Sequence, residues 1–131
     1  MYTMKDVCDK YDLPYETLRY YCNEGLIPNI KRDHNNYRIF DDRNLETIKG
    51  IQCLRKCGLG IKELKHYMEL ALEGQSSIKQ RMMMLEKQKL ELLQKQKEIE
   101  ESLNYIKEKN QFYQDVLEGK IKYKSNIIDV D

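Results

Sequence analysis

The sequence predicts a mainly α-helical fold, in which a small winged helix-turn-helix head with a two-stranded wing precedes one long coiled-coil helix. Two short helical patterns separated by a tight turn within residues 3–23 predict the head. Apolar residues that recur every seven positions between 78 and 117 predict the long helix. The 131 residues, 34% charged and 40% hydrophobic, suit a small core plus a solvated helix better than one large core.

The helix-turn-helix prediction begins at Thr3, whose side chain suits a helix N-cap before an acidic first turn. The first helix is expected over about residues 4–11. After a short connection, Pro14 is a favourable first residue for a second helix that runs to about residue 23. Gly25 then supplies a left-handed stop.

The predicted wing occupies residues 29–40, where extended sequence surrounds the pair Asn35-Asn36. Asparagine tolerates positive φ, so this pair suits the turn of a hairpin. Two further helices complete the head, which we assign to residues 1–74. Asp41 is expected to cap the third helix, and the fourth begins near Ile61.

The last helix is predicted over residues 75–119, with Ser77 and Gln80 as its capping box. Residues 75–118 contain no glycine or proline, and nine of twelve seam positions are apolar. The alternative is a solvated amphipathic helix packed on its own head, but a head of this size cannot cover about 60 Å of helix. Residues 120–131 form a tail without a firm structural prediction. The apolar seam residues expected at a dimer interface are Ile78, Met82, Leu85, Leu92, Ile99, Leu103, Ile106, Tyr113 and Leu117.

Composition excludes several classes of protein. The net charge is only +1, so a nucleic-acid-binding face must come from local placement of basic residues. No apolar run is long enough to span a membrane, and the N-terminus lacks the apolar stretch of a signal peptide. The four cysteines are therefore expected to be reduced thiols in a cytoplasm. We find no glycine-rich phosphate loop, nucleophile elbow or paired carboxylates, so we predict no enzyme, catalytic residue or cofactor.

The second predicted helix presents an outward face that suits nucleic acid. Tyr15 and Arg19 share this face, with Glu16 and Tyr20 beside them. A guanidinium beside phenol hydroxyls suits phosphate and base-edge contacts. The alternative, which the residues alone leave open, is an ordinary solvated face with an Arg–Glu pair.

The predicted wing carries Lys31, Arg32, Tyr37 and Arg38. Tyr37 and Arg38 are consecutive, so on a strand one is expected to pack while the other reaches phosphate. Charge-rich hairpins are also common on surfaces that bind nothing, so this pattern is not specific by itself.

The order of the motifs resembles the MerR family of transcription regulators over residues 2–70. The strings that carry the resemblance are Thr17-Leu18-Arg19-Tyr20-Tyr21, Gly25-Leu26-Ile27-Pro28, Asn36-Tyr37-Arg38-Ile39-Phe40, Asp42 to Leu45, and Leu54-Arg55-Lys56-Cys57-Gly58-Leu59. The resemblance implies a homodimer joined by an antiparallel coiled coil, with helix two in a major groove and the wing on the flanking backbone.

The resemblance also implies a mechanism. Such proteins bind double-stranded promoter DNA at a palindromic, overlong spacer between the elements that RNA polymerase recognises, and they bend and untwist that spacer. Two departures from the family pattern are Pro14, where Ser or Thr usually caps helix two, and Asn36, where glycine is usual. Carried onto this chain, the expected DNA contacts are Tyr15, Thr17, Arg19, Tyr20, Arg32, Tyr37 and Arg38.

The sequence defines the signal to which the protein responds less closely than it defines the DNA-binding residues. No cysteine follows Cys57 and no histidine follows His66, so a soft-metal site of the family type is not expected. The segment 50–59 resembles the short aldehyde- and electrophile-responsive subgroup, of the AdhR and NmlR kind, in which a cysteine at the position of Cys53 is the proposed sensor. A small buried structural thiol is the alternative for Cys53. For the whole chain, the alternative to a DNA-binding regulator is a coiled-coil scaffold that binds no DNA.

Overall fold

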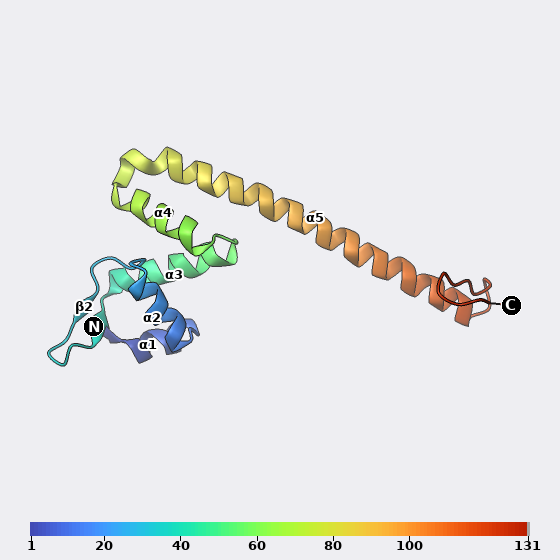
Figure 1. Cartoon of the computed structure of the whole chain (residues 1–131), viewed down its shortest axis with the longest axis horizontal. Helices are drawn as coiled ribbons and strands as arrows, with labels where there is room; N and C mark the ends of the chain where they lie inside the picture. Colours follow the sequence, from blue (N-terminus) through green and yellow to red (C-terminus); the bar gives the residue numbers. More distant parts are fainter. Residues whose placement is uncertain (131) are drawn as a thin grey trace. The chain divides into compact units, whose positions relative to one another are not determined.

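The computed structural model describes residues 1–130, and it confirms the mainly α-helical fold with a wing and a long last helix (Figure 1). The chain forms two compact units, one up to Leu90 and one from Glu91 onward. Compactness does not test which segment folds or dimerises alone, so the boundaries expected at 74 and 119 stay predictions. The elements are β1 (Tyr2–Thr3), α1 (Met4–Tyr11), α2 (Tyr15–Asn23), β2 (Lys31–Arg32), β3 (Arg38–Phe40), α3 (Asp42–Lys56), α4 (Ile61–Leu72), the 3₁₀ helix η1 (Gly74–Ser77) and α5 (Ile78–Leu117).

The helix-turn-helix forms because each end of its helices is satisfied locally. Thr3 and Asp6 form a reciprocal capping box at the start of α1, in which the Thr3 hydroxyl accepts from the Asp6 N–H at 3.1 Å. The expectation that Pro14 is the first helical residue is wrong by one position. Pro14 has an extended backbone and is the N-cap of α2, and its carbonyl accepts the Leu18 N–H at 3.1 Å. Gly25 has φ +72°, which confirms the predicted left-handed stop.

The two predicted wing strands are present, and a third strand that the sequence did not indicate joins them. The sheet is antiparallel with the order β1-β3-β2, and Tyr2 of β1 pairs with Phe40. A strand of two residues is too short to show alternation in the sequence, so β1 could not be found from its pattern. Asn36 has φ +64° in the wing turn, which confirms that asparagine adopts the conformation expected there.

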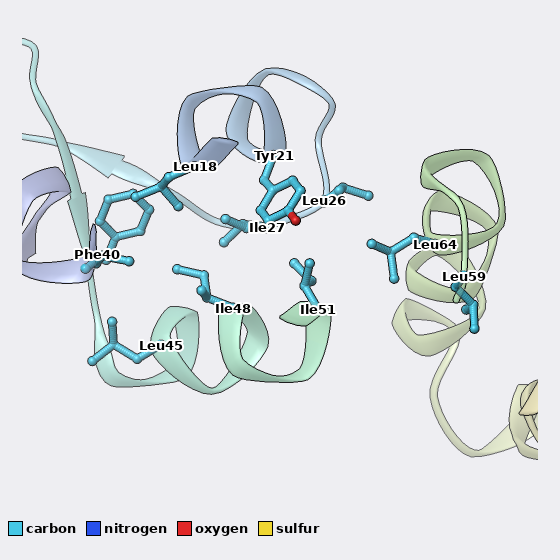
Figure 2. Packing of buried hydrophobic residues seen from close by; sticks show 11 residues of the cluster. Leu18, Tyr21, Leu26, Ile27, Phe40, Leu45, Ile48, Ile51, Leu59 and Leu64 are labelled. Carbon is cyan, nitrogen blue, oxygen red and sulfur yellow. The ribbon is translucent and has the colours of Figure 1, made fainter. Parts of the chain in front are cut away.

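The hydrophobic core lies in the head and joins α1, α2, the sheet, α3 and α4. Figure 2 shows side chains of α2, β3 and α3 gathered in this cluster, including Leu18, Phe40 and Ile48, all of which are 0% exposed. Burying side chains of this size stabilises a fold by about 1.5–3 kcal/mol each. The core therefore fixes one face of α2 inward. The buried cluster comprises Val7, Leu18, Tyr21, Leu26, Ile27, Phe40, Leu45, Ile48, Ile51, Leu59 and Leu64.

The start of α3 confirms the predicted cap at Asp41. The Asp41 carboxylate accepts the N–H of Asn44 at 2.8 Å, and the Asn44 side chain accepts the N–H of Asp41 at 3.0 Å. Asn44 also donates to the carbonyl of Pro28 at 3.0 Å. This buried asparagine thereby joins α3 to the segment that leads into the wing.

The capping box predicted from Ser77 and Gln80 is wrong. The Ser77 side chain is buried and donates backward, to the carbonyls of Gly74 at 3.0 Å and of Leu70. Its hydroxyl also accepts from Nε of Arg81 at 3.0 Å. The physical reason is that η1 runs directly into α5, so residue 77 does not precede a free helix end.

Helix α5 has 40 residues, which corresponds to about 60 Å of helix. The nine predicted seam residues are all exposed in the single chain, and Leu92 is the least exposed of them at 37%. Apolar side chains exposed at heptad spacing are what an unpaired coiled-coil helix presents. Within residues 1–130 no helix is long and apolar enough to cross a membrane.

Candidate DNA-binding surface

The surface of α2 that faces away from the core is aromatic and basic. The Tyr15 and Tyr20 side chains are 53% and 45% exposed, and that of Arg19 is also exposed. Thr17 is half-buried, between this surface and the core. Burial of Leu18 and Tyr21 on the opposite side fixes which residues point outward. We call the three exposed residues, together with the half-buried Thr17 at their edge, the α2 surface; it comprises Tyr15, Thr17, Arg19 and Tyr20.

Arg19 forms the ion pair that the alternative interpretation of this face expected. Its guanidinium lies 3.8 Å from the Glu16 carboxylate, and both side chains are more than half exposed. An exposed pair of this kind contributes at most about 0.5 kcal/mol within a helix. Arg19 therefore remains able to exchange this carboxylate for a phosphate.

The wing turn is built by side chains as well as by the backbone. The Asp33 carboxylate accepts the N–H groups of Asn35 at 2.9 Å and Tyr37 at 3.0 Å. Arg32 donates from Nη1 to the carbonyl of Asn36 at 2.8 Å. These bonds hold the tip in one conformation, and Arg32 keeps its remaining donors for another acceptor.

Of the two consecutive wing residues, one of which was expected to pack, Arg38 packs against the end of α2 and Tyr37 does not. Tyr37 is 69% exposed, whereas Arg38 is partly buried and donates from Nη2 to the side-chain oxygen of Asn23 at 2.7 Å. Asn23 is the last residue of α2, so this bond joins the wing to the helix. Burial raises the pKa of the Cys22 thiol, and the positive charges of Arg38 and Arg32 oppose that rise. The Asn23 bond places Arg38 at the C-terminal end of α2, and Arg32 pairs with Arg38 across the wing strands.

The structure thus places the seven predicted contact residues on α2 and the adjoining wing of one compact unit. Sequence reasoning missed Asn23, which orients Arg38, and Asp33, which shapes the wing turn. An Asp two residues before an Asn-Asn pair is a turn signal that could have identified Asp33. Nothing in the local pattern pointed to Asn23, because its partner is fifteen residues away.

A second feature of the head is an open apolar groove between α3 and α4, with a volume of about 320 Å³. Cys53 lies at this groove as a free, exposed thiol, so it is not the small buried residue of the alternative interpretation. Tyr67 and Met68 of α4 form the opposite side. The neighbouring Arg55 donates from Nη1 to the Leu59 carbonyl at 2.8 Å. We call this feature the Cys53 groove.

The described residues contain no group of three or more His, Cys, Asp or Glu side chains that could hold a metal ion.

A helix-turn-helix packed on a buried core, an exposed basic and aromatic face on its second helix and an adjoining wing define a winged helix-turn-helix regulator. The model of the MerR HTH family regulatory protein matches residues 2–71, and the chain belongs to this family. The resemblance seen in the motifs is thereby confirmed.

Relatives extend the likeness beyond the head. An uncharacterised HTH-type transcriptional regulator of Haemophilus influenzae is 32% identical over 86% of this chain and 84% of its own length. The HTH-type transcriptional regulator AdhR of Bacillus subtilis is 35% identical over 67% of this chain and 63% of its own. These relatives are transcription regulators and not enzymes, as the sequence predicted.

Solved structures give the same result. The chain resembles HiNmlR, described as a MerR family regulator lacking the sensor domain and bound to promoter DNA. The TM-score is 0.75, with 31% identity over 88% of this chain and 91% of that one. A MerR family regulator from Bacillus thuringiensis gives a TM-score of 0.72, with 30% identity over 86% of this chain and 98% of that one.

Proposed function

We propose that this protein binds a palindromic promoter spacer as a homodimer and distorts that DNA to control transcription by RNA polymerase. The observation that carries the proposal is the joined surface of α2 and the wing, in a chain that resembles a regulator bound to promoter DNA. Such a protein acts where the chromosome lies, in the cytoplasm. The contacts proposed are those of the α2 surface together with Arg32, Tyr37 and Arg38.

Chemistry divides these contacts into two groups. Arg19, Arg32 and Arg38 present guanidinium groups that suit phosphate oxygens, and these contacts set affinity and its salt dependence. The other four contacts present hydroxyl groups that suit backbone or base-edge contacts, namely Tyr15, Thr17, Tyr20 and Tyr37. The Arg38–Asn23 bond supports the proposal, because it fixes the wing relative to the helix before DNA arrives.

The DNA contacts are tested by binding of the full-length protein to the promoter of its own gene over a series of salt concentrations. Arg19→Ala and Arg38→Ala are each expected to weaken binding and to lower the salt slope by about one. Lys97→Ala on α5 is the charge-matched control and should leave the slope unchanged. Asn23→Ala separates the two roles of Arg38, which are the bond to Asn23 and the proposed phosphate contact, because this variant lacks the bond but keeps the positive charge of Arg38. Unchanged slopes in both arginine variants would contradict the contacts, and absence of binding at low salt would favour the scaffold alternative.

The dimer is proposed to form through the exposed seam of α5 in antiparallel orientation. Ile99 lies in the middle of this seam and is 60% exposed in the single chain. Ile99→Asp places a charge where apolar side chains are expected to pack, so sedimentation should show monomers. Lys97→Asp is the control on the same helix outside the seam. A stable Ile99→Asp dimer would show that the seam is misassigned.

Two heads at the ends of such a helix pair suit a mechanism in which the spacer is deformed rather than merely covered. The measurement is transcription in vitro from the natural promoter and from one with a shortened spacer. Activation is expected only from the natural length. Equal activation of both templates would exclude distortion as the mechanism.

We further propose that Cys53 senses aldehydes or other electrophiles. Its exposure and its position in an open groove give a small reagent access to the thiol. Promoter output is compared with and without formaldehyde in the wild type, Cys53→Ala and the control Cys57→Ala. The response is expected to disappear only in Cys53→Ala, and an equal response in all three proteins would remove Cys53 from the mechanism.

A further inference from the structure

The C-terminal unit contains a folded tail that the sequence pattern did not predict. Gly119 has φ +74° and ends α5, and the N–H of Lys120 then bonds back to the carbonyl of Asp115 at 2.9 Å. Further on, the Ser125 hydroxyl accepts the N–H of Ile127 at 3.0 Å and forms a local turn. The chain therefore reverses after α5, and residues 123–127 share one cavity with the end of the helix.

This cavity has a volume of about 560 Å³, within the range of about 300–1,000 Å³ that small-molecule sites occupy. Four of its ten lining residues are aromatic, three from α5 and one from the tail. The rings of Phe112 and Tyr113 lie with centroids 5.6 Å apart and planes tilted by 58°. We call it the aromatic cavity, and its rings are Tyr105, Phe112, Tyr113 and Tyr123.

Two lysines give the aromatic cavity a positive charge. Lys109 Nζ lies 5.9 Å from the centroid of Phe112 and 5.7 Å from that of Tyr113, and Lys124 enters from the tail. Within residues 1–130, neither ammonium group forms an ion pair with a carboxylate. The lining carboxylate, Glu108, accepts a hydrogen bond from Asn104 Nδ2 at 3.2 Å. The lining therefore carries two ammonium groups against one carboxylate.

We propose that the aromatic cavity binds a planar aromatic carboxylate. The ligand ring packs between tyrosine and phenylalanine rings, which favour offset or edge-to-face contacts with another ring. Its carboxylate accepts charge-assisted hydrogen bonds from Lys109 and Lys124. This occupant matches both properties of the site, because an apolar helix would cover the rings and leave the two ammonium groups without a partner.

All the lining residues belong to one chain, so no second chain is needed to form the cavity. Tyr113 nevertheless belongs both to the predicted seam and to the aromatic cavity. If the dimer forms as proposed, a ligand that fixes the Tyr113 ring acts directly on a seam residue. Ligand binding and seam packing are then linked, and the linkage is reciprocal.

The test is calorimetric titration of the full-length protein with 2-naphthoate and with its neutral analogue 2-naphthamide. Naphthoate is expected to bind more tightly than the amide. Lys109→Gln and Lys124→Gln should each weaken naphthoate binding by about two- to five-fold, the effect of one partly exposed ion pair, and leave the amide unchanged. Lys107→Gln, an exposed lysine of α5 outside the lining, is the matched control. Tyr123→Ala should weaken both ligands, and Tyr123→Phe neither.

Three outcomes would overturn the proposal. The first is no binding of naphthoate at about 1 mM, the result expected if a second copy of the chain fills the cavity. The second is equal affinity for the acid and the amide, which would show that the lysines do not recognise charge. The third is binding that Lys109→Gln and Tyr123→Ala leave unchanged, which would place the ligand elsewhere. Circular dichroism of each variant checks that α5 is intact.

Discussion

Gln88 joins the first part of α5 to the turn between α3 and α4. Its side chain is only 5% exposed, and Nε2 donates to the carbonyl of Cys57 at 2.6 Å. Cys57 is the C-cap of α3, where the helical hydrogen bonds end and carbonyls need other partners. We therefore predict that replacing Gln88 destabilises the head.

The size of the effect follows from the burial. A hydrogen bond contributes about 0.5–1.5 kcal/mol, and a carbonyl left without a partner costs up to about 1–3 kcal/mol where, as at the part-buried Cys57, water has restricted access. Gln88→Ala should therefore lower the free energy of unfolding by about 1–3 kcal/mol. Gln88→Met keeps most of the side-chain volume, so any decrease in the free energy of unfolding in this variant is caused by loss of the hydrogen bond. Gln94→Ala is the matched control, since Gln94 is exposed and its contact with Glu98 spans 3.4 Å.

Urea unfolding followed by circular dichroism measures the difference. The protomer concentration is held fixed, because the stability of a dimer depends on it. The control should change the free energy by less than about 0.5 kcal/mol. The reasoning is refuted if Gln88→Ala is no more destabilising than Gln94→Ala, or if Gln88→Met behaves as the wild type.

Three further predictions concern the head. Asn36→Ala should lower the free energy of unfolding by about 1 kcal/mol in urea, because alanine is strained at φ +64°, whereas Asn36→Gly should not. The pKa of Asp6 is held below its ordinary value by the N–H and then the hydroxyl of Thr3, so NMR titration of Thr3→Ala should show it rise. A carboxyl pKa that is lower in the folded than in the unfolded protein stabilises the fold above the unfolded pKa, and this stabilisation is lost as the pH falls through the folded pKa. Because Thr3→Ala removes part of it, acid unfolding of this variant should begin at a higher pH. Mass spectrometry after brief iodoacetamide treatment should find Cys53 alkylated before Cys22, whose pKa burial raises.

The sequence predicted the features that are encoded locally. The caps at Thr3 and Asp41 depend on side chains three residues apart, and the structure has both capping boxes. Glycine at position 25 and asparagine at position 36 marked backbone positions with positive φ, and both are observed. A repeat of seven residues needs no tertiary information, so α5 was predictable to within a few residues.

The features that were missed depend on partners far apart in the chain. Asn23 and Arg38 are fifteen residues apart, and Gln88 and Cys57 are thirty-one apart, so no window of sequence contains the evidence for either bond. The prediction for Ser77 failed for a related reason. A serine at the start of a helix suggested an N-cap, but the 3₁₀ helix η1 precedes α5 directly, so there is no free helix end to cap. In each case a polar side chain that looked solvated is held by a backbone or side-chain partner brought close by the fold.

Polar contacts between elements connect α2, which we propose to face DNA, with the start of α5. Glu24 at the end of α2 pairs with Lys65 of α4. Ser77, which ends η1, donates to the carbonyl of Leu70 in the last turn of α4. Gln88 then holds α5 against the end of α3.

The Cys53 groove lies between α3 and α4, so we expect an adduct there to change the packing of the two helices to which these polar contacts attach. Spatial connection alone does not establish coupling. The coupling free energy is given by the difference in DNA affinity between the free and the alkylated protein, and we would measure it in the wild type and in Gln88→Met. A smaller difference in Gln88→Met would show that this contact carries part of the signal. An equal difference would show that the adduct acts on the head without α5.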